Sequence, residues 1–159
     1  MKIVNTLSTM AVLLSLTTIA AASAAADGNG GEKLSRDQLH MAVQQICPVR
    51  GNKLGSHGEP VKVKIGDETN FLCCQGCTSG QVDPDHWATI HANFAEAQGI
   101  CPVMKNKLPE NPKWTIVEGQ IIYVCCPPCL EKIEAEPKTY LKAVDELYRA
   151  SLDGQSADR

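Results

Sequence analysis

The stretch Cys73-Cys74-Gln75-Gly76-Cys77 recurs further along the chain as Cys125-Cys126-Pro127-Pro128-Cys129. Each copy is preceded by a Cys-Pro-Val tripeptide, at residues 47–49 and 101–103. These two sets contain all eight cysteines of the 159-residue chain. A doubled pattern of this kind indicates that the chain is built from two similar units.

The repeat extends beyond the cysteines. The two Cys-Pro-Val tripeptides are 54 residues apart, whereas the two cysteine pairs are 52 residues apart, so the first copy contains an insertion. We place this insertion in the Gly-rich loop 55–59. From Pro60 and Pro112 onward, the two copies align without gaps as far as the last cysteine.

Within each copy the pattern predicts a β-hairpin that leads into the cysteines. In the first copy, the alternating run 61–65 is followed by turn residues at 66–68. In the second copy, the β-rich runs 114–117 and 121–124 flank a Glu118-Gly119 turn. Runs of β-branched and aromatic residues separated by such a turn are typical of hairpins.

Helices are predicted on either side of the hairpins. Ser35 and Gln38 have the spacing of a capping box, which predicts a helix that ends before Pro48. Asp83 followed by proline predicts the start of a helix after the first cysteine cluster. In the second copy, a broad apolar face predicts a helix after Pro137.

The expected fold class is therefore α+β, with two tandem small cysteine-rich modules, each a β-hairpin with a cysteine knuckle followed by a helix. The expected organisation, from the N-terminus to the C-terminus, is a signal peptide at 1–26, a leader and N-terminal helix at 27–45, a first cysteine-rich module at 46–99, a second cysteine-rich module at 100–152 and a polar tail at 153–159.

The N-terminal segment has the features of a signal peptide. Lys2 precedes an apolar run from about residue 10 to 22, and Ala24-x-Ala26 fits a small-residue cleavage site. The apolar run is shorter than the roughly 20 residues that span a membrane. We therefore expect a periplasmic or secreted protein, with no stable membrane insertion after cleavage.

Composition narrows the functions further. The formal net charge is -3, so no basic surface points to nucleic acid as a partner. Aromatic residues make up only 4%, and small domains with weak cores usually need disulfides or metals. The sequence contains no Ser-His-Asp set, paired-carboxylate signature or phosphate-binding glycine loop, so we do not expect an enzyme.

Eight thiols in this arrangement favour the binding of a soft metal ion, Zn(II) or Cu(I). A Cys-x-x-Cys pair at a turn can reach one ion, and the Cys-Pro-Val loop supplies a more distant ligand. The candidate metal ligands are Cys47, Cys73, Cys74 and Cys77 in the first copy, and Cys101, Cys125, Cys126 and Cys129 in the second copy.

The first cysteine of each adjacent pair is the open question. Consecutive strand residues point to opposite faces, so Cys73 and Cys74 can share one ion only if the strand has ended before them. If the strand continues, Cys73 and Cys125 are small buried hydrophobic residues instead. This reasoning favours Cys74 and Cys126 as ligands over their neighbours.

These motifs resemble those of the YHS/TRASH superfamily, from about Ile46 to Tyr148. The shared features are Cys-Pro-Val, a hairpin, an aromatic residue shortly before Cys-Cys-x-x-Cys, and a downstream Asp-Pro-x-x-aromatic sequence. The glycine of the first loop, Gly51, is replaced by Lys105 in the second copy, which departs from the family pattern. The resemblance implies a role in heavy-metal trafficking, resistance or sensing. The cysteine pattern of the family is similar to Cys47/Cys73/Cys77 and to Cys101/Cys125/Cys129.

Two alternatives stay open. Secretion favours disulfides, so each copy could hold two disulfides and bind no metal. The chain could instead be a thiol–disulfide oxidoreductase, because the Cys126–Cys129 pair is predicted between a strand and a helix, where a thiol pKa can be depressed. The compact knuckles favour metal over a disulfide scaffold, and the sequence has no thioredoxin-like βαβ pattern. The sequence identifies no protein partner.

Overall fold

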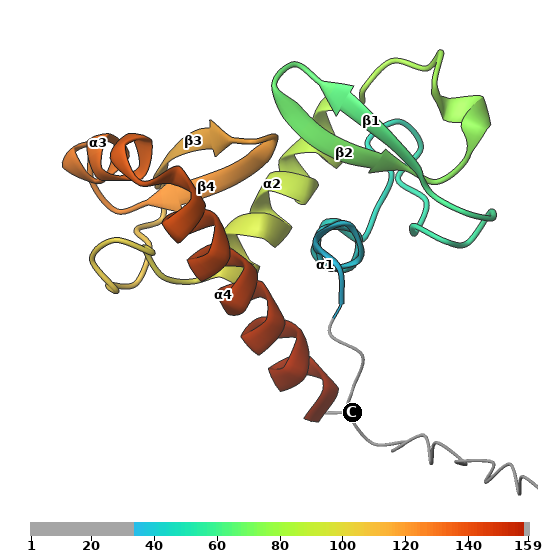
Figure 1. Cartoon of the computed structure of the whole chain (residues 1–159). Coiled ribbons are helices and arrows are strands. Elements are labelled where there is room, and N and C mark those ends of the chain that lie inside the picture. The colour runs from blue at the N-terminus through green and yellow to red at the C-terminus, as the bar shows by residue number, and fades with distance from the viewer. Residues whose placement is uncertain (1–33, 158–159) are drawn as a thin grey trace, which may run out of the picture. The chain divides into compact units, whose positions relative to one another are not determined.

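The structure is a computed structural model that describes residues 34–157, which lie within one compact unit. The expected signal peptide lies outside the described residues. The fold is mixed α+β, as the sequence predicts, and contains two small hairpins and two cysteine clusters. The elements follow one another as α1 (Arg36–Gln44), β1 (Val61–Ile65), β2 (Glu68–Leu72), the short 3-10 helix η1 (Gln75–Cys77), α2 (Pro84–Gln98), β3 (Lys113–Val117), β4 (Gln120–Val124), α3 (Pro128–Ala135) and α4 (Pro137–Ala157) (Figure 1).

Both hairpins are antiparallel, and each second strand ends directly before a cysteine pair. In the first hairpin Val61 pairs with Leu72, and in the second Lys113 pairs with Val124. Every residue of β4 is buried, and most of β2 is buried as well, whereas β1 alternates between half-buried and exposed positions. The buried second strand of each hairpin therefore carries the chain from the protein interior into the cysteine knuckle.

The predicted helix starts are confirmed. The Ser35 side chain accepts a hydrogen bond from the Gln38 N–H, and the Gln38 side chain accepts one from the Ser35 N–H. The Asp83 carboxylate accepts hydrogen bonds from the backbone N–H groups of Asp85 and His86 at the start of α2. These contacts satisfy amide groups that lack partners within the first helical turn.

Helix α2 connects the two halves of the molecule. It directly precedes the second Cys-Pro-Val loop, just as α1 directly precedes the first. Helix α1 is followed by Gln45 at φ 64°, and α2 is followed by Gly99 at φ 62°. Each helix end leads directly into an Ile-Cys-Pro-Val sequence. The structural repeat is therefore helix, Cys-Pro-Val loop, hairpin and cysteine knuckle, with α2 belonging to both copies.

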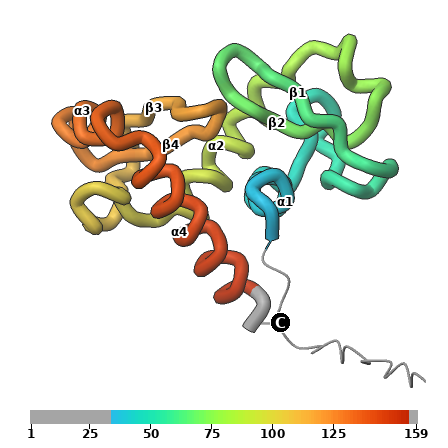
Figure 2. The backbone as a smooth tube through the Cα atoms, in the orientation of Figure 1, coloured from blue at the N-terminus to red at the C-terminus, as the bar shows by residue number. Residues whose placement is uncertain are grey.

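The main core contains residues from both halves. Figure 2 shows the backbone path of the elements that contribute them. Helices α1, α2 and α4 contact one another pairwise, and α2 and α4 also contact β4. The side chains of Leu39, Phe94, Ile122 and Tyr148, from four different elements, are almost completely buried in this core. A second, smaller apolar cluster lies around the cysteines of the first copy.

Helix α4 is longer than the apolar pattern indicates. It continues through most of the polar tail, as far as Ala157. Leu152 packs against the main core, so the helix follows the core surface into this region. Among the described residues, none of the helices is both long enough and apolar enough to cross a membrane.

Candidate metal centre

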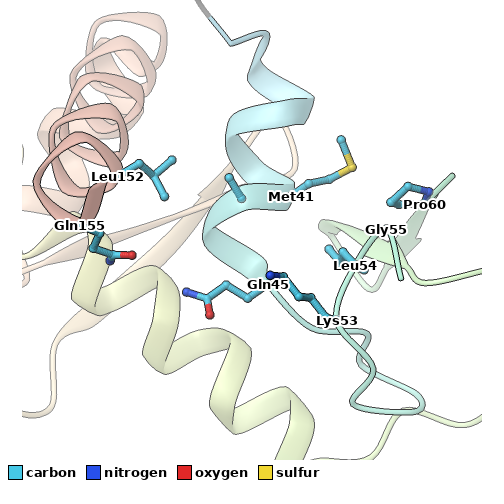
Figure 3. A pocket seen from close by; sticks show the side chains of 9 residues that line it. Met41, Gln45, Lys53, Leu54, Gly55, Pro60, Leu152 and Gln155 are labelled. Carbon is cyan, nitrogen blue, oxygen red and sulfur yellow. The ribbon is translucent and has the colours of Figure 1, made fainter. Parts of the chain in front are cut away.

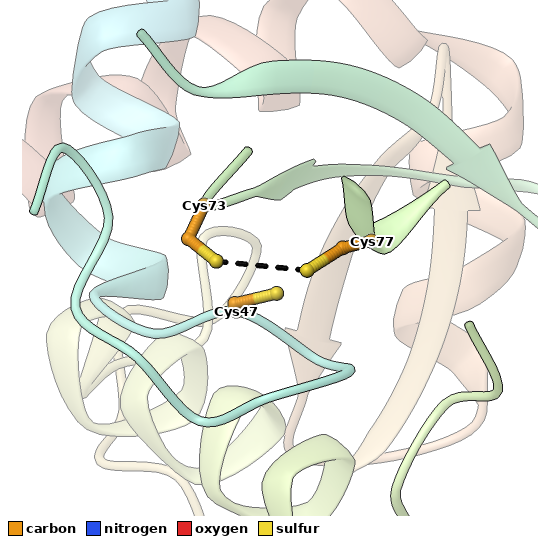
Figure 4. Close-up of side chains that lie close together, drawn as sticks. All are labelled: Cys47, Cys73 and Cys77. Carbon is orange, nitrogen blue, oxygen red and sulfur yellow. Dashed lines mark hydrogen bonds between the residues drawn. The ribbon is translucent and has the colours of Figure 1, made fainter. Parts of the chain in front are cut away.

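The structure brings three thiols together in each copy. The Sγ atoms of Cys47, Cys73 and Cys77 all lie within 4.8 Å of one another (Figure 4). Their residues are at most 1% exposed. In the second copy the Sγ atoms within 4.8 Å of one another are those of Cys101, Cys125 and Cys129.

The distances between the sulfur atoms match those expected when three cysteines bind the same metal ion. Tetrahedral Zn(II) with Zn–S bonds of about 2.3 Å places its sulfur ligands about 3.8 Å apart. The Sγ–Sγ distance is 3.6 Å between Cys73 and Cys77, and 3.8 Å between Cys101 and Cys129. Cys125 and Cys129 are 4.0 Å apart. The thiols are therefore placed to share an ion without a large movement of the backbone.

Cys74 and Cys126 lie beside these groups rather than within them. The Sγ of Cys74 is 4.0 Å from that of Cys73 and 3.8 Å from that of Cys77. The Sγ of Cys126 is 3.8 Å from that of Cys125 and 3.1 Å from that of Cys129. Both Cys74 and Cys126 are partly exposed.

The strand ends explain how the first cysteine of each pair can join the cysteine of the Cys-Pro-Val loop. Strand β2 ends at Leu72 and β4 ends at Val124, so the strand alternation no longer applies to the cysteines that follow. The sequence argument favours Cys74 and Cys126, but the structure groups Cys73 and Cys125 with the cysteines of the Cys-Pro-Val loops.

Each Cys-Pro-Val loop is closed by a pair of backbone hydrogen bonds. The Cys47 N–H donates to the Asn52 carbonyl at 2.8 Å, and the Gly51 N–H donates to the Cys47 carbonyl at 2.9 Å. The second loop has the same two bonds, with Lys105 at the position equivalent to Gly51. Gly51 has φ 67° and Lys105 has φ 60°, so the replacement of glycine does not alter the loop conformation.

The loops also stabilise a thiolate. Burial raises the pKa of the Cys47 thiol, but hydrogen bonds from the backbone N–H groups of Cys73, Arg50 and Val49 outweigh it, and the net pKa is lowered. The pKa of Cys101 is lowered in the same way, by N–H groups that include those of Met104 and Cys125. A thiolate at the Cys-Pro-Val position is the form that binds a metal ion.

The remaining buried thiols favour their neutral form when no metal is bound. Burial raises the pKa of Cys73, and burial together with the thiol of Cys73 raises the pKa of Cys77 to about 12. The pKa of Cys129 is raised for the same reasons, burial first. A positive ion is therefore needed to hold all three sulfurs as thiolates, and its binding must release protons.

Two buried glutamines, which the cysteine motifs did not indicate, position the segments that carry the candidate metal-binding cysteines. The Gln44 side chain donates to the carbonyls of Ile46 and Phe71 and accepts from the Phe71 N–H, at 2.7–2.9 Å. It thereby ties the residue before Cys47 to the strand that leads into Cys73. The same three bonds join Gln98 to Ile100 and Tyr123 in the second copy. The signal was a glutamine three residues before each Cys-Pro-Val tripeptide.

The two centres differ in their surroundings. Cys47, Cys73 and Cys77 belong to the smaller apolar cluster, in which Leu72 is the one buried residue other than cysteine. Cys101 and Cys129 belong instead to the main core. The first centre therefore lies in a small apolar cluster of its own, whereas the second centre is continuous with the main core.

Among the described residues, no histidine belongs to either cysteine cluster. His91 lies 3.2 Å from the Glu68 carboxylate through Nε2, and its Nδ1 lies 3.1 Å from the Tyr123 hydroxyl. His86 packs over Gly51, where a Cβ atom would lie 2.5 Å from its Nε2. His57 is exposed in its loop. Met104, in the second Cys-Pro-Val loop, is 50% exposed.

A pocket of about 410 Å³ lies between α1, the loop after the first Cys-Pro-Val tripeptide and α4 (Figure 3). Its lining includes Met41 of α1, Gln45 directly after this helix, Leu54 and Pro60 of the loop, and Gln155 of α4. This lining is mixed and contains no convergent set of charged groups, so the pocket does not define a chemical site.

Comparison of the chain with protein-family models, with curated proteins and with solved structures finds no match. The case for function therefore rests on the geometry of the cysteines and on the motifs of the sequence.

Proposed function

We propose that this protein binds one soft metal ion, Cu(I) or Zn(II), at each of its two cysteine clusters and serves in metal handling or resistance. The ligands are Cys47, Cys73 and Cys77 at the first site and Cys101, Cys125 and Cys129 at the second site. The resemblance to YHS/TRASH domains supports this role, as does the expectation of a periplasmic or secreted location.

The observation that carries the proposal is the duplicated three-sulfur cluster. Both copies of the repeat bring a loop cysteine and two knuckle cysteines within 4.8 Å of one another, although the residues between the knuckle cysteines differ. Burying three thiols in one place has no packing advantage over burying aliphatic side chains. A metal ion bound by all three sulfurs accounts for the clustering of the thiols in both copies.

The donor set selects the class of ion. Thiolates favour Cu(I), Zn(II) and other soft or borderline ions over Mg²⁺ or Ca²⁺, which take oxygen ligands. Three sulfurs suffice for trigonal Cu(I), whereas Zn(II) requires a fourth ligand to complete its tetrahedron. A coordination number of three would therefore favour Cu(I), and a coordination number of four would favour Zn(II).

The main alternative is that the cysteines form disulfides and bind no metal. All eight cysteines are free thiols in the structure. The four thiols of each copy could pair as two disulfides, but their Sγ atoms lie 3.1–4.0 Å apart, which is the spacing of thiolates around a shared ion rather than the roughly 2.05 Å of a bonded pair. The thiol–disulfide oxidoreductase is a weaker alternative, because the three-thiol clusters place a third sulfur beside each Cys-x-x-Cys pair.

The test combines elemental analysis with thiol titration on the full chain, purified without reduction and with exclusion of air. We expect one metal ion for each cluster, and reactive thiols that appear only after the metal is removed with a chelator. The Cys73→Ser/Cys77→Ser and Cys125→Ser/Cys129→Ser variants should each lose one ion. Protein that carries no metal, and no free thiols after chelation, contradicts the proposal and supports the disulfide scaffold.

A further inference from the structure

Each copy contains two overlapping triangles of sulfur atoms rather than one. We call Cys47, Cys73 and Cys77 the inner triad of the first copy, and Cys73, Cys74 and Cys77 its outer triad. The three Sγ–Sγ distances of the outer triad are 4.0, 3.6 and 3.8 Å. The two triads share the Cys73–Cys77 edge and differ in a single sulfur.

The second copy repeats this arrangement. Its inner triad is Cys101, Cys125 and Cys129, and its outer triad exchanges Cys101 for Cys126. The Sγ–Sγ distances of the outer triad are 3.8, 4.0 and 3.1 Å. The sequence between the outer cysteines is Gln-Gly in one copy and Pro-Pro in the other, so two different turns produce the same geometry.

The two triads differ in their access to solvent. Cys47 and Cys101, which are specific to the inner triads, are each 0% exposed. Cys74 and Cys126, which are specific to the outer triads, are partly exposed. A chelator or a partner protein can therefore reach an ion in an outer triad through Cys74 or Cys126. An ion in the first inner triad is covered, because all three of its cysteines are buried, whereas the second inner triad includes the partly exposed Cys125.

We propose that Cys74 and Cys126 are transfer thiols, through which a soft metal ion passes between the inner triad and an external thiol or thioether ligand. This inference rests on the proposed metal-binding function. The ion enters the outer triad and then moves inward by exchanging one sulfur, while the two sulfurs of the shared edge remain bound.

The exchange is balanced in bonds and charge. For inward movement, the bond to Cys74 breaks as a bond to Cys47 forms, and the ion keeps its oxidation state. The incoming thiol releases its proton when it binds, and the departing thiolate takes up a proton. No oxidant or reductant is required, so the step is reversible.

This role predicts that Cys74 and Cys126 affect the rate of metal transfer more than the affinity. The decisive variant is Cys74→Ser/Cys126→Ser, since serine oxygen is a poor ligand for soft ions. The probe is Cu(I), loaded without oxygen onto the full chain, and its transfer to a coloured Cu(I) chelator is followed by stopped-flow absorbance. Gln75→Ser, at an exposed position of the same turn, is the matched control.

We expect the double variant to bind the same number of Cu(I) ions as the unaltered chain, with an unchanged sulfur count by X-ray absorption. Its transfer to the chelator should be slower by about tenfold or more, which corresponds to about 1.4 kcal/mol in the barrier. The Gln75→Ser control should transfer at the original rate.

Three other results are distinguishable. An unchanged transfer rate in the double variant overturns the inference and leaves the proposed function intact. A lost ion or a reduced sulfur count shows that Cys74 and Cys126 are permanent ligands, which also overturns it. Failure of the unaltered chain to bind Cu(I) or Zn(II) contradicts the proposed function itself.

Discussion

At the scale of single residues, Lys105 is the one position of the second Cys-Pro-Val loop where the local conformation opposes the residue type. Its φ of 60° lies in the left-handed region, which costs a non-glycine residue about 1 kcal/mol or more. We expect Lys105→Gly to raise the free energy of unfolding by roughly 0.5–1 kcal/mol, measured by urea denaturation. A decrease would show that the Lys105 side chain has a stabilising contact.

The matched change in the first loop should act in the opposite direction. Gly51→Ala places a Cβ at φ 67°, and that atom would lie 2.5 Å from the His86 Nε2. We expect a loss of stability of more than about 1 kcal/mol. Together the two variants test whether both loops need the same backbone conformation.

His40 makes the protein sensitive to acid. Burial lowers the pKa of its imidazole to about 4, and the rings of Phe71 and Phe94 lie against it. Three carboxylates partly oppose this shift, while Lys62 adds to it. The folded state therefore holds His40 neutral, and its contribution to stability is complete above pH 6.5 and is lost as the pH falls toward 4.

Between pH 6.5 and pH 4, we expect the free energy of unfolding of the metal-free protein to fall by roughly 3 kcal/mol because of His40. His40→Leu should remove most of this acid sensitivity, whereas His57→Leu, at an exposed loop residue, should retain it. The measurement is the urea midpoint of the three proteins between pH 7 and pH 4. An identical pH dependence in His40→Leu would mean that another group is responsible.

At the scale of the elements, the buried glutamines hold each helix end to its hairpin. Gln44→Ala leaves the Phe71 N–H and two carbonyls without their partners in a buried region. We expect a loss of about 2–4 kcal/mol in the free energy of unfolding. Because Gln44 fixes Cys47 relative to Cys73, metal affinity at the first site should fall as well.

The matched variants separate the hydrogen bonds from the side-chain volume. Gln44→Glu keeps the shape but places an oxygen against two carbonyl groups, so it should destabilise the protein at neutral pH. Gln45→Ala, at the exposed neighbouring position, should have little effect. Calorimetric titration with Zn(II) that shows the same affinity at the first site in Gln44→Ala as in the unaltered chain would contradict the positioning role.

The elements themselves could be predicted because each has a local signal. The capping residues Ser35 and Asp83, the alternation in 61–65 and the turn at Glu118-Gly119 act within a few residues of the structures they specify. The grouping of Cys73 with Cys47 could not be derived in this way. It depends on the ending of β2 at Leu72 and on contacts between residues far apart in the chain.

At the scale of the whole molecule, the two sequence copies share one core. Helix α1 precedes the first cysteine-rich module but packs against α2 and α4. The sequence repeat shows which segments are equivalent. It does not predict that α2 both ends the first copy and begins the second. That role follows from the equivalent ends of α1 and α2, which only the backbone conformation reveals.

A shared core implies that damage in one half destabilises both. Tyr148 of α4 is 1% exposed, and its ring lies 5.9 Å from that of Phe94 in α2. We expect Tyr148→Ala to cost about 3 kcal/mol or more, because it leaves a large cavity in the main core. Hydrogen exchange should then accelerate in α1 and β2 as well as in β4.

Trp114→Ala is the control from the same half, since Trp114 is 50% exposed and its removal opens no buried cavity. Its exchange in α1 and β2 should remain slow. If Tyr148→Ala accelerates exchange only after residue 99, the two copies unfold independently, and α2 does not couple them. Faster exchange in both halves instead means that the two cysteine clusters depend on one cooperative core, in which a metal ion at either site stabilises the whole fold.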